Sequence, residues 1–110
     1  MRPVFLGAVV VAAASFAGSA RADDAAVQLQ IKDHALVPAK LSVAHGRRFE
    51  LVVTNAGPGT EEIESKGLRI EKIIPEGQSV TIRLGPLKPG TYDLFGDFHL
   101  DTCVGTLVVE

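Results

Sequence analysis

Side chains that could bind a metal ion are concentrated near the C-terminal end of the chain. Residues 92–109 are typical of a strand, a tight loop and a second strand, and the loop contains Asp97, His99, Asp101 and the only cysteine, Cys103. Carboxylate, imidazole and thiolate groups are the usual protein ligands of transition metals. A loop held between paired strands fixes such ligands in space. We therefore expect a metal site at this end of the fold, whereas His34 and His45, in early turns, are expected to be surface residues.

The middle of the chain carries a second group of carboxylates. If residues 66–67 form a two-residue hairpin turn, Glu64 lies opposite Arg69 and Glu62 lies opposite Glu71. Like charges directly opposed across two strands are destabilising, and a bound cation would offset the repulsion. The alternative is that both carboxylates point into solvent, where screening makes the repulsion small.

The elements that must position these residues are strands. Residues 27–32 and 77–84 alternate apolar and polar side chains, residues 48–54 are typical of another strand, and residues 36–43 resemble an extended edge interrupted by proline. About seven or eight short strands, separated by turn signals, predict an all-β fold, a single Greek-key β-sandwich. The aromatic residues expected to carry much of its core are Phe49, Tyr92, Phe95 and Phe98.

The N-terminal residues are typical of a secretory signal peptide. An arginine precedes a short apolar run, and Ala20-Arg21-Ala22 offers a cleavage site. The apolar run is too short to span a membrane comfortably, although an uncleaved anchor is the alternative. We expect residues 1–22 to be removed and residues 23–110 to form one domain, with no membrane insertion after cleavage and a periplasmic location.

The size and charge of the chain restrict the kinds of ligand that it is expected to bind. The expected mature chain has 88 residues, with 9 basic and 13 acidic side chains. An acidic domain of this size is a poor candidate for binding nucleic acid or an anionic membrane, but it is compatible with binding cations. One cysteine cannot form an internal disulfide, so it is a ligand, an intermolecular partner or a buried apolar residue. No hydrolase motif is present.

Several short motifs make the chain similar to a known family. Glu62-Ile63-Glu64-Ser65, the turn 85–92 and the segment 95–99 resemble the cupredoxin-like domain of bacterial periplasmic iron-uptake systems, over essentially the whole of residues 27–110. The resemblance implies a cupredoxin fold and a role in ferrous-iron uptake. It also implies action with an iron permease and other periplasmic iron-uptake proteins, with iron oxidation as an additional possibility.

The sequence departs from an electron-transfer cupredoxin at its copper ligands. The region of Glu61 and Glu62 stands where the upstream histidine is expected, Gly96 where the copper-binding cysteine is expected, and Cys103 where the axial methionine is expected. A type 1 blue copper centre needs two histidines, a cysteine and an axial ligand. These departures therefore argue against a blue copper centre.

Three hypotheses remain open. The leading one is a metal-binding protein of iron uptake that holds Fe or Cu(II) and acts as a monomer or a homodimer, with a ferroxidase contribution left open. The second is a copper-binding or copper-delivery protein using His99, Cys103 and nearby carboxylates, and the third is an interaction module without metal. The candidate metal ligands are Glu62, Glu64, Glu71, Asp97, His99 and Cys103.

Overall fold

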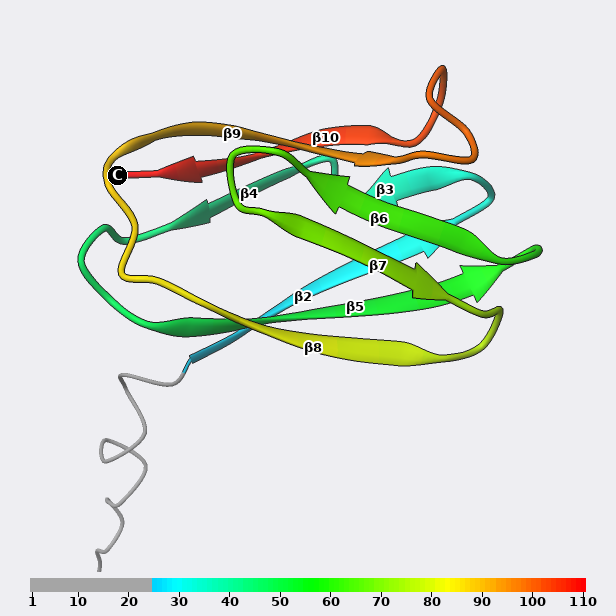
Figure 1. The fold of residues 1–110 in the computed structure, drawn as a ribbon, viewed down its shortest axis with the longest axis horizontal. Helices are drawn as coiled ribbons and strands as arrows, with labels where there is room; N and C mark the ends of the chain where they lie inside the picture. Colours follow the sequence, from blue (N-terminus) through cyan, green and yellow to red (C-terminus); the bar gives the residue numbers. More distant parts are fainter. Residues whose placement is uncertain (1–24) are drawn as a thin grey trace, which may run out of the picture.

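Two β-sheets stacked face to face form the fold (Figure 1). The computed structural model describes residues 25–110, so the predicted signal peptide lies outside the described residues. The described part contains no helix, and therefore no helix that could cross a membrane. Its strands are β2 (Ala25–Lys32), β3 (Ala35–Val37), β4 (Lys40–Val43), β5 (Phe49–Gly57), β6 (Glu61–Ser65), β7 (Ile70–Ile74), β8 (Ser79–Leu84), β9 (Gly90–Gly96) and β10 (Val104–Val109).

The strand order confirms the predicted all-β sandwich. One sheet has the order β4-β10-β9-β6-β7, and the other has the order β3-β2-β5-β8. The described residues form nine strands, one or two more than expected, because residues 36–43 contribute to two strands in different sheets. β3 pairs with β2, whereas β4 runs parallel to β10. Pro38 lies between them, where the chain leaves one sheet edge for the other, a position that needs no ladder N–H.

Strand alternation places the core between the sheets. In β5, Leu51 and Val53 are fully buried, and their neighbours in sequence are half-exposed. Burying each such side chain contributes about 1.5–3 kcal/mol. The matching inward residues of the other central strands are Leu29 and Ile31 in β2, Ile63 in β6, Leu94 in β9 and Leu107 in β10.

The aromatic contribution to the core is smaller than predicted. Phe49 is buried, and Tyr92 packs against the core with its hydroxyl donating to the carbonyl oxygen of Lys88 at 2.8 Å. Phe98 is 49% exposed, so its predicted core role is wrong. It lies beyond the end of β9, where the strand alternation no longer determines which side chains point inward.

The β6–β7 hairpin differs from its predicted register. The connection is a four-residue turn, residues 66–69, so Glu64 lies opposite Glu71 and Glu62 lies opposite Ile73. The predicted pairing of Glu64 with Arg69 is therefore wrong. The longer turn lets Leu68 pack into the core, 9% exposed, and it places Arg69 in the left-handed region with φ 58°. Burial of Leu68 favours this turn over the tighter one.

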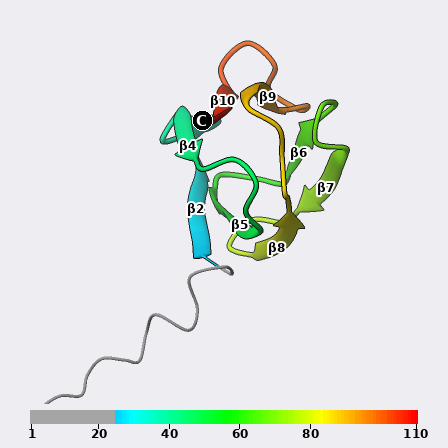
Figure 2. The same cartoon turned by 90° about the vertical axis from the view of Figure 1, so that its left-hand side faces the viewer.

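Four connections gather at one end of the sandwich, on the right in Figure 1 and hereafter called the site end. They are the β2–β3 turn, the β5–β6 loop, the β7–β8 turn and residues 97–103 between β9 and β10. Backbone hydrogen bonds hold two of them against neighbouring strands: the amide of Asp33 donates to the carbonyl of Gly57 in β5 at 2.9 Å, and the amide of Asp97 donates to the carbonyl of Glu62 in β6 at 2.8 Å. Viewed along the sandwich, the two sheets enclose a single core (Figure 2).

Candidate metal centre

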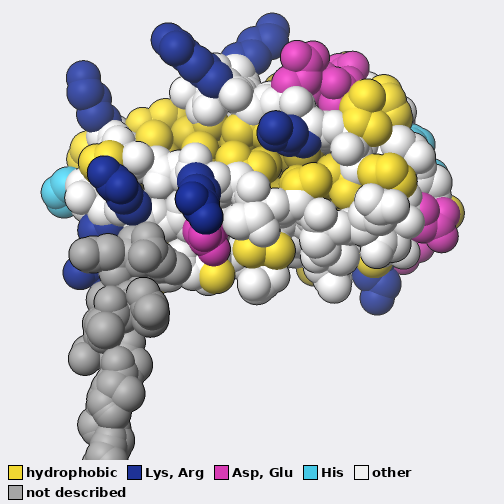
Figure 3. Space-filling view, turned by 60° about the horizontal axis from the view of Figure 1, so that its bottom comes forward, with side chains coloured by type: hydrophobic (Ala, Val, Ile, Leu, Met, Phe, Trp, Pro, Cys, Tyr) yellow, Lys and Arg dark blue, Asp and Glu magenta, His cyan; other side chains and the backbone are white. Residues whose placement is uncertain are grey.

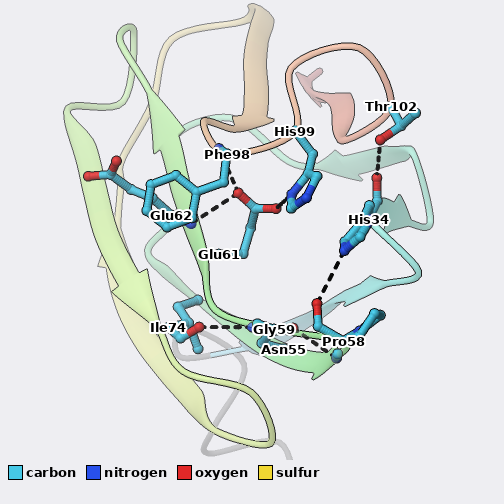
Figure 4. A network of polar contacts seen from close by, with 11 residues as sticks. His34, Asn55, Pro58, Gly59, Glu61, Glu62, Ile74, Phe98, His99 and Thr102 are labelled. Carbon is cyan, nitrogen blue, oxygen red and sulfur yellow. Dashed lines mark hydrogen bonds and ion pairs between the residues drawn. The ribbon is translucent and has the colours of Figure 1, made fainter.

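Glu61, the first residue of β6, is a buried carboxylate at the site end. It occupies an inward position of the strand and is 2% exposed. Its Oε2 accepts hydrogen bonds from the amides of Phe98 at 2.8 Å and Glu62 at 3.2 Å, and its Oε1 lies 2.6 Å from Nδ1 of His99 (Figure 4). A buried carboxylate is stable only with such partners. With Glu61 ionised, Nδ1 of His99 must carry the proton that joins the pair.

The loop that carries His99 is fixed by its own backbone. The amide of His99 donates to the carbonyl of Gly96 at 3.0 Å, and the amides of Thr102 and Cys103 donate to the carbonyl of His99 at 3.2 Å and 2.8 Å. The His99 side chain is 32% exposed, so part of the ring remains accessible to solvent. The loop prediction is confirmed, and the imidazole it carries is held by tertiary contacts.

His34 belongs to the same cluster, which the sequence did not indicate. Its ring stacks on that of His99, with centroids 3.7 Å apart and an interplanar angle of 9°. Its Nε2 lies 3.2 Å from the carbonyl oxygen of Pro58. His34 is half-buried where a surface residue was expected, whereas His45 is exposed as predicted. His34 and His99 are far apart in sequence, so only the fold shows their contact.

Cys103 is buried against the same carboxylate. A Cβ atom added to Gly96 would lie 2.5 Å from Cys103 Sγ and 2.8 Å from Glu61 Cδ, so the thiol and the carboxylate meet in the space that a side chain at position 96 would fill. Burial, followed by the nearby charge of Glu61, raises the pKa of the Cys103 thiol to about 11. The thiol is therefore protonated at neutral pH and becomes a ligand only by losing its proton.

The remaining predicted ligands lie elsewhere. Glu62 and Glu64 are on the opposite side of β6 from Glu61, and Figure 4 shows the Glu62 carboxylate pointing away from His99. Oxygen atoms of Glu62, Glu64 and Asp97 all lie within 4.8 Å of one another. Partial burial, followed by the Glu64, Glu71 and Asp97 charges, raises the pKa of Glu62. The six predicted ligands thus divide between two places: His99 and Cys103 beside Glu61, and the carboxylate triad on the outer face with Glu71 across from Glu64.

The surroundings of both places favour cations. On the face shown in Figure 3, Lys and Arg side chains gather mainly toward the left, whereas carboxylates lie toward the upper right and right, the side of the site end. A groove of about 660 Å³ runs along the outer face of the five-stranded sheet and is lined in part by Glu64 and Asp97 of the triad. Separation of charge along the molecule concentrates cations at the negative end.

The fold and these ligand types define a cupredoxin-like protein, and sequence comparison agrees. Residues 5–109 match the family model described as "Cupredoxin-like domain", so the chain belongs to the cupredoxin-like family. A relative in Rickettsia prowazekii (strain Madrid E), the uncharacterized protein RP394, is 45% identical over 84 residues, which cover 76% of this chain and 67% of the relative.

Solved structures of similar fold include the copper-bound domain of an ATPase and two further proteins. The metal-binding domain of the Cu(I)-exporting P-type ATPase CopA from Streptococcus pneumoniae D39, solved with Cu(I), superposes with a TM-score of 0.66 at 20% identity and covers 77% of this chain and 84% of its own. Auracyanin B gives a TM-score of 0.66 at 16% identity, and the match covers 77% of this chain and 88% of auracyanin B. A purple cupredoxin from Nitrosopumilus maritimus gives a TM-score of 0.57 at 19% identity, and the match covers 79% of this chain and 100% of the purple cupredoxin. These likenesses establish the fold.

Proposed function

We propose that this protein binds copper at the site end, through Glu61, His99 and Cys103. The observation that carries the proposal is the buried Glu61 carboxylate, which contacts the His99 imidazole at 2.6 Å on one side and lies beside the Cys103 thiol at Gly96 on the other. Membership of the cupredoxin-like family supports it, as does the Cu(I) named for the similar CopA domain. Copper therefore fits better than iron as the metal of this centre.

The ligand types favour copper over harder ions. Imidazole and carboxylate suit Cu(II), and a thiolate adds preference for copper or zinc. Bound copper would supply a redox-active or transferable ion. Glu61, His99 and Cys103 would hold it, the imidazole through a ring nitrogen that carries no proton. Because the Cys103 thiol must lose its proton to become a ligand, copper affinity rises with pH.

A copper titration of residues 23–110 tests this proposal. We expect one ion per chain by calorimetry, with affinity falling roughly 10–100-fold or more in His99→Ala and in Cys103→Ala. Glu50→Gln, which removes a carboxylate that lies in β5 and pairs with the exposed Arg83, is the matched control and should bind as the wild type does. Wild-type binding at the level of these two variants would refute the copper centre.

A second candidate function is iron binding by the carboxylate triad. Glu62, Glu64 and Asp97 offer oxygen atoms within 4.8 Å of one another, and oxygen ligands suit harder ions such as iron. They would also stabilise Fe(III) over Fe(II), which connects this site to iron oxidation and to uptake with an iron permease. Titration with Fe(II) and with chelated Fe(III), in wild type and in Glu64→Gln, separates the two functions, since that variant leaves the Glu61 centre intact.

Export and partners complete the proposal. The N-terminal segment supports cleavage after Ala22 and function in the periplasm, beside metal permeases and other periplasmic proteins. Fractionation of cells expressing the full chain, followed by N-terminal sequencing, checks both points. A cytoplasmic protein with an intact N-terminus would contradict them. Sedimentation with and without copper distinguishes a monomer from a metal-bridged homodimer.

A further inference from the structure

The two-residue turn between β2 and β3 has a histidine, His34, at a position where glycine is preferred. Lys32 pairs with Ala35, and the two residues between them, Asp33 and His34, both have positive φ, 52° and 61°. A type I′ hairpin turn requires positive φ at both positions, and glycine is strongly preferred at the second. Histidine is tolerated there but strained relative to glycine. Turn formation alone therefore does not explain His34.

The tertiary contacts of His34 account for the presence of a histidine at this position of the turn. Its ring stacks on His99, its Nε2 contacts the Pro58 carbonyl oxygen at 3.2 Å, and its own carbonyl accepts a hydrogen bond from the Thr102 hydroxyl at 2.6 Å. One residue of the β2–β3 turn thus contacts both the β5–β6 loop and the loop that carries His99. Figure 4 shows these contacts on the side of His99 away from Phe98.

We propose that His34 is a positioning residue for the metal centre. Its stacked ring holds the His99 ring in the plane in which Nδ1 reaches the Glu61 carboxylate, so the Nδ1–H tautomer depends on both contacts. The ring torsion of histidine is broad on its own, so neither contact alone defines both the plane and the edge. A metal site functions only when its ligands are held within about 0.5 Å and 10–20° of the productive geometry. The role in copper affinity rests on the proposed function, whereas the orientation of His99 is a property of the metal-free chain.

The replacement His34→Gly separates positioning from folding. Asp-Gly is a favoured type I′ pair, so the turn should be at least as stable as in the wild type, while the stacked ring is lost. Two-bond ¹H–¹⁵N correlation spectra of the metal-free protein should show one His99 tautomer, protonated at Nδ1, in the wild type and a mixture in the variant. Copper affinity should fall roughly 10–100-fold, and the Cu(II) electron paramagnetic resonance spectrum should become heterogeneous.

Two further variants sharpen the test. His34→Phe keeps an aromatic face over His99 but loses the Pro58 contact and places a bulky side chain at positive φ. We expect it to be less stable yet to retain the single tautomer and the copper affinity. His45→Gly removes an exposed histidine from the turn at the opposite end and should leave every His99 signal unchanged.

The outcomes distinguish this inference from the proposed function. An unchanged tautomer population and copper affinity in His34→Gly would overturn the positioning role even if the wild type binds copper. A tautomer shift in His34→Gly, in a protein that binds no copper, would support the positioning of His99 and refute the copper centre.

Discussion

At the scale of single residues, Gly96 makes the candidate centre possible. Its missing side chain leaves room for both Cys103 Sγ and Glu61 Cδ, each within 3 Å of where a Cβ would stand. Gly96→Ala should therefore force both groups apart and lower the free energy of unfolding by about 1–3 kcal/mol. Urea denaturation measures this change.

A double-mutant cycle controls that prediction. Removing the thiol with Cys103→Ala should make the added methyl of Gly96→Ala less damaging, because the two side chains would compete for the same space. Additive effects of the two replacements would contradict the proposed contact and place the strain elsewhere.

Cys103 also predicts a pH dependence of stability. Its pKa in the folded state, about 11, is raised above the ordinary value of 9.0 for a cysteine thiol. The folded state therefore holds the thiol proton where the unfolded state has begun to lose it. The resulting stabilisation is fully present below pH 9 and is lost as the pH rises toward 11, amounting to roughly 2–3 kcal/mol. Comparing wild type with Cys103→Ala across this range isolates the thiol; parallel profiles would show that its pKa is not raised.

At the scale of elements, the β6–β7 hairpin places two carboxylates directly opposite each other. Glu64 faces Glu71 across the strand pair, and after partial burial the negative charge of each also raises the pKa of Glu62. Glu71→Lys should replace repulsion with attraction and stabilise the fold by about 0.2–1 kcal/mol. The gain should shrink at high salt, since exposed charges are screened. Lys72→Glu, a charge change at the neighbouring position of β7, is the control and should not reproduce the gain.

The hairpin and the early turn show where sequence patterns stop being sufficient. Alternation correctly predicted that Glu62 and Glu64 share a face, because a register shift of two residues preserves the faces of both strands. It could not predict the partner of Glu64, which depends on Leu68 packing inside the turn. The class of fold was predictable from local patterns. The contact of His34 with His99 was not, because it depends on how two loops from different sheets meet.

At the scale of the whole molecule, Asn55 joins the two sheets below the site end. It lies in β5, is 1% exposed, and its Nδ2 donates to the carbonyl oxygens of Ile74 and Gly59, both at 2.8 Å. Its Oδ1 accepts from the amide of Gly57 at 2.9 Å. Ile74 belongs to β7 of the opposite sheet, so this one amide connects both layers and orders the β5–β6 loop that contacts His34.

Asn55→Ala should therefore destabilise the whole domain rather than one loop. It leaves buried backbone groups without partners, at about 1–3 kcal/mol for an unsatisfied group, and it opens a cavity between the sheets. We expect a loss of roughly 2–4 kcal/mol in the free energy of unfolding, a large share of the stability of a domain this small. Thr54 lies next to Asn55 in β5, and Thr54→Ala removes only an exposed hydrogen bond to Ser79 of β8. This control should lower the free energy of unfolding by less than about 1 kcal/mol. Equal losses in the two variants would mean that the buried amide does not hold the sheets together, and that packing of the apolar core alone sets the geometry of the site end.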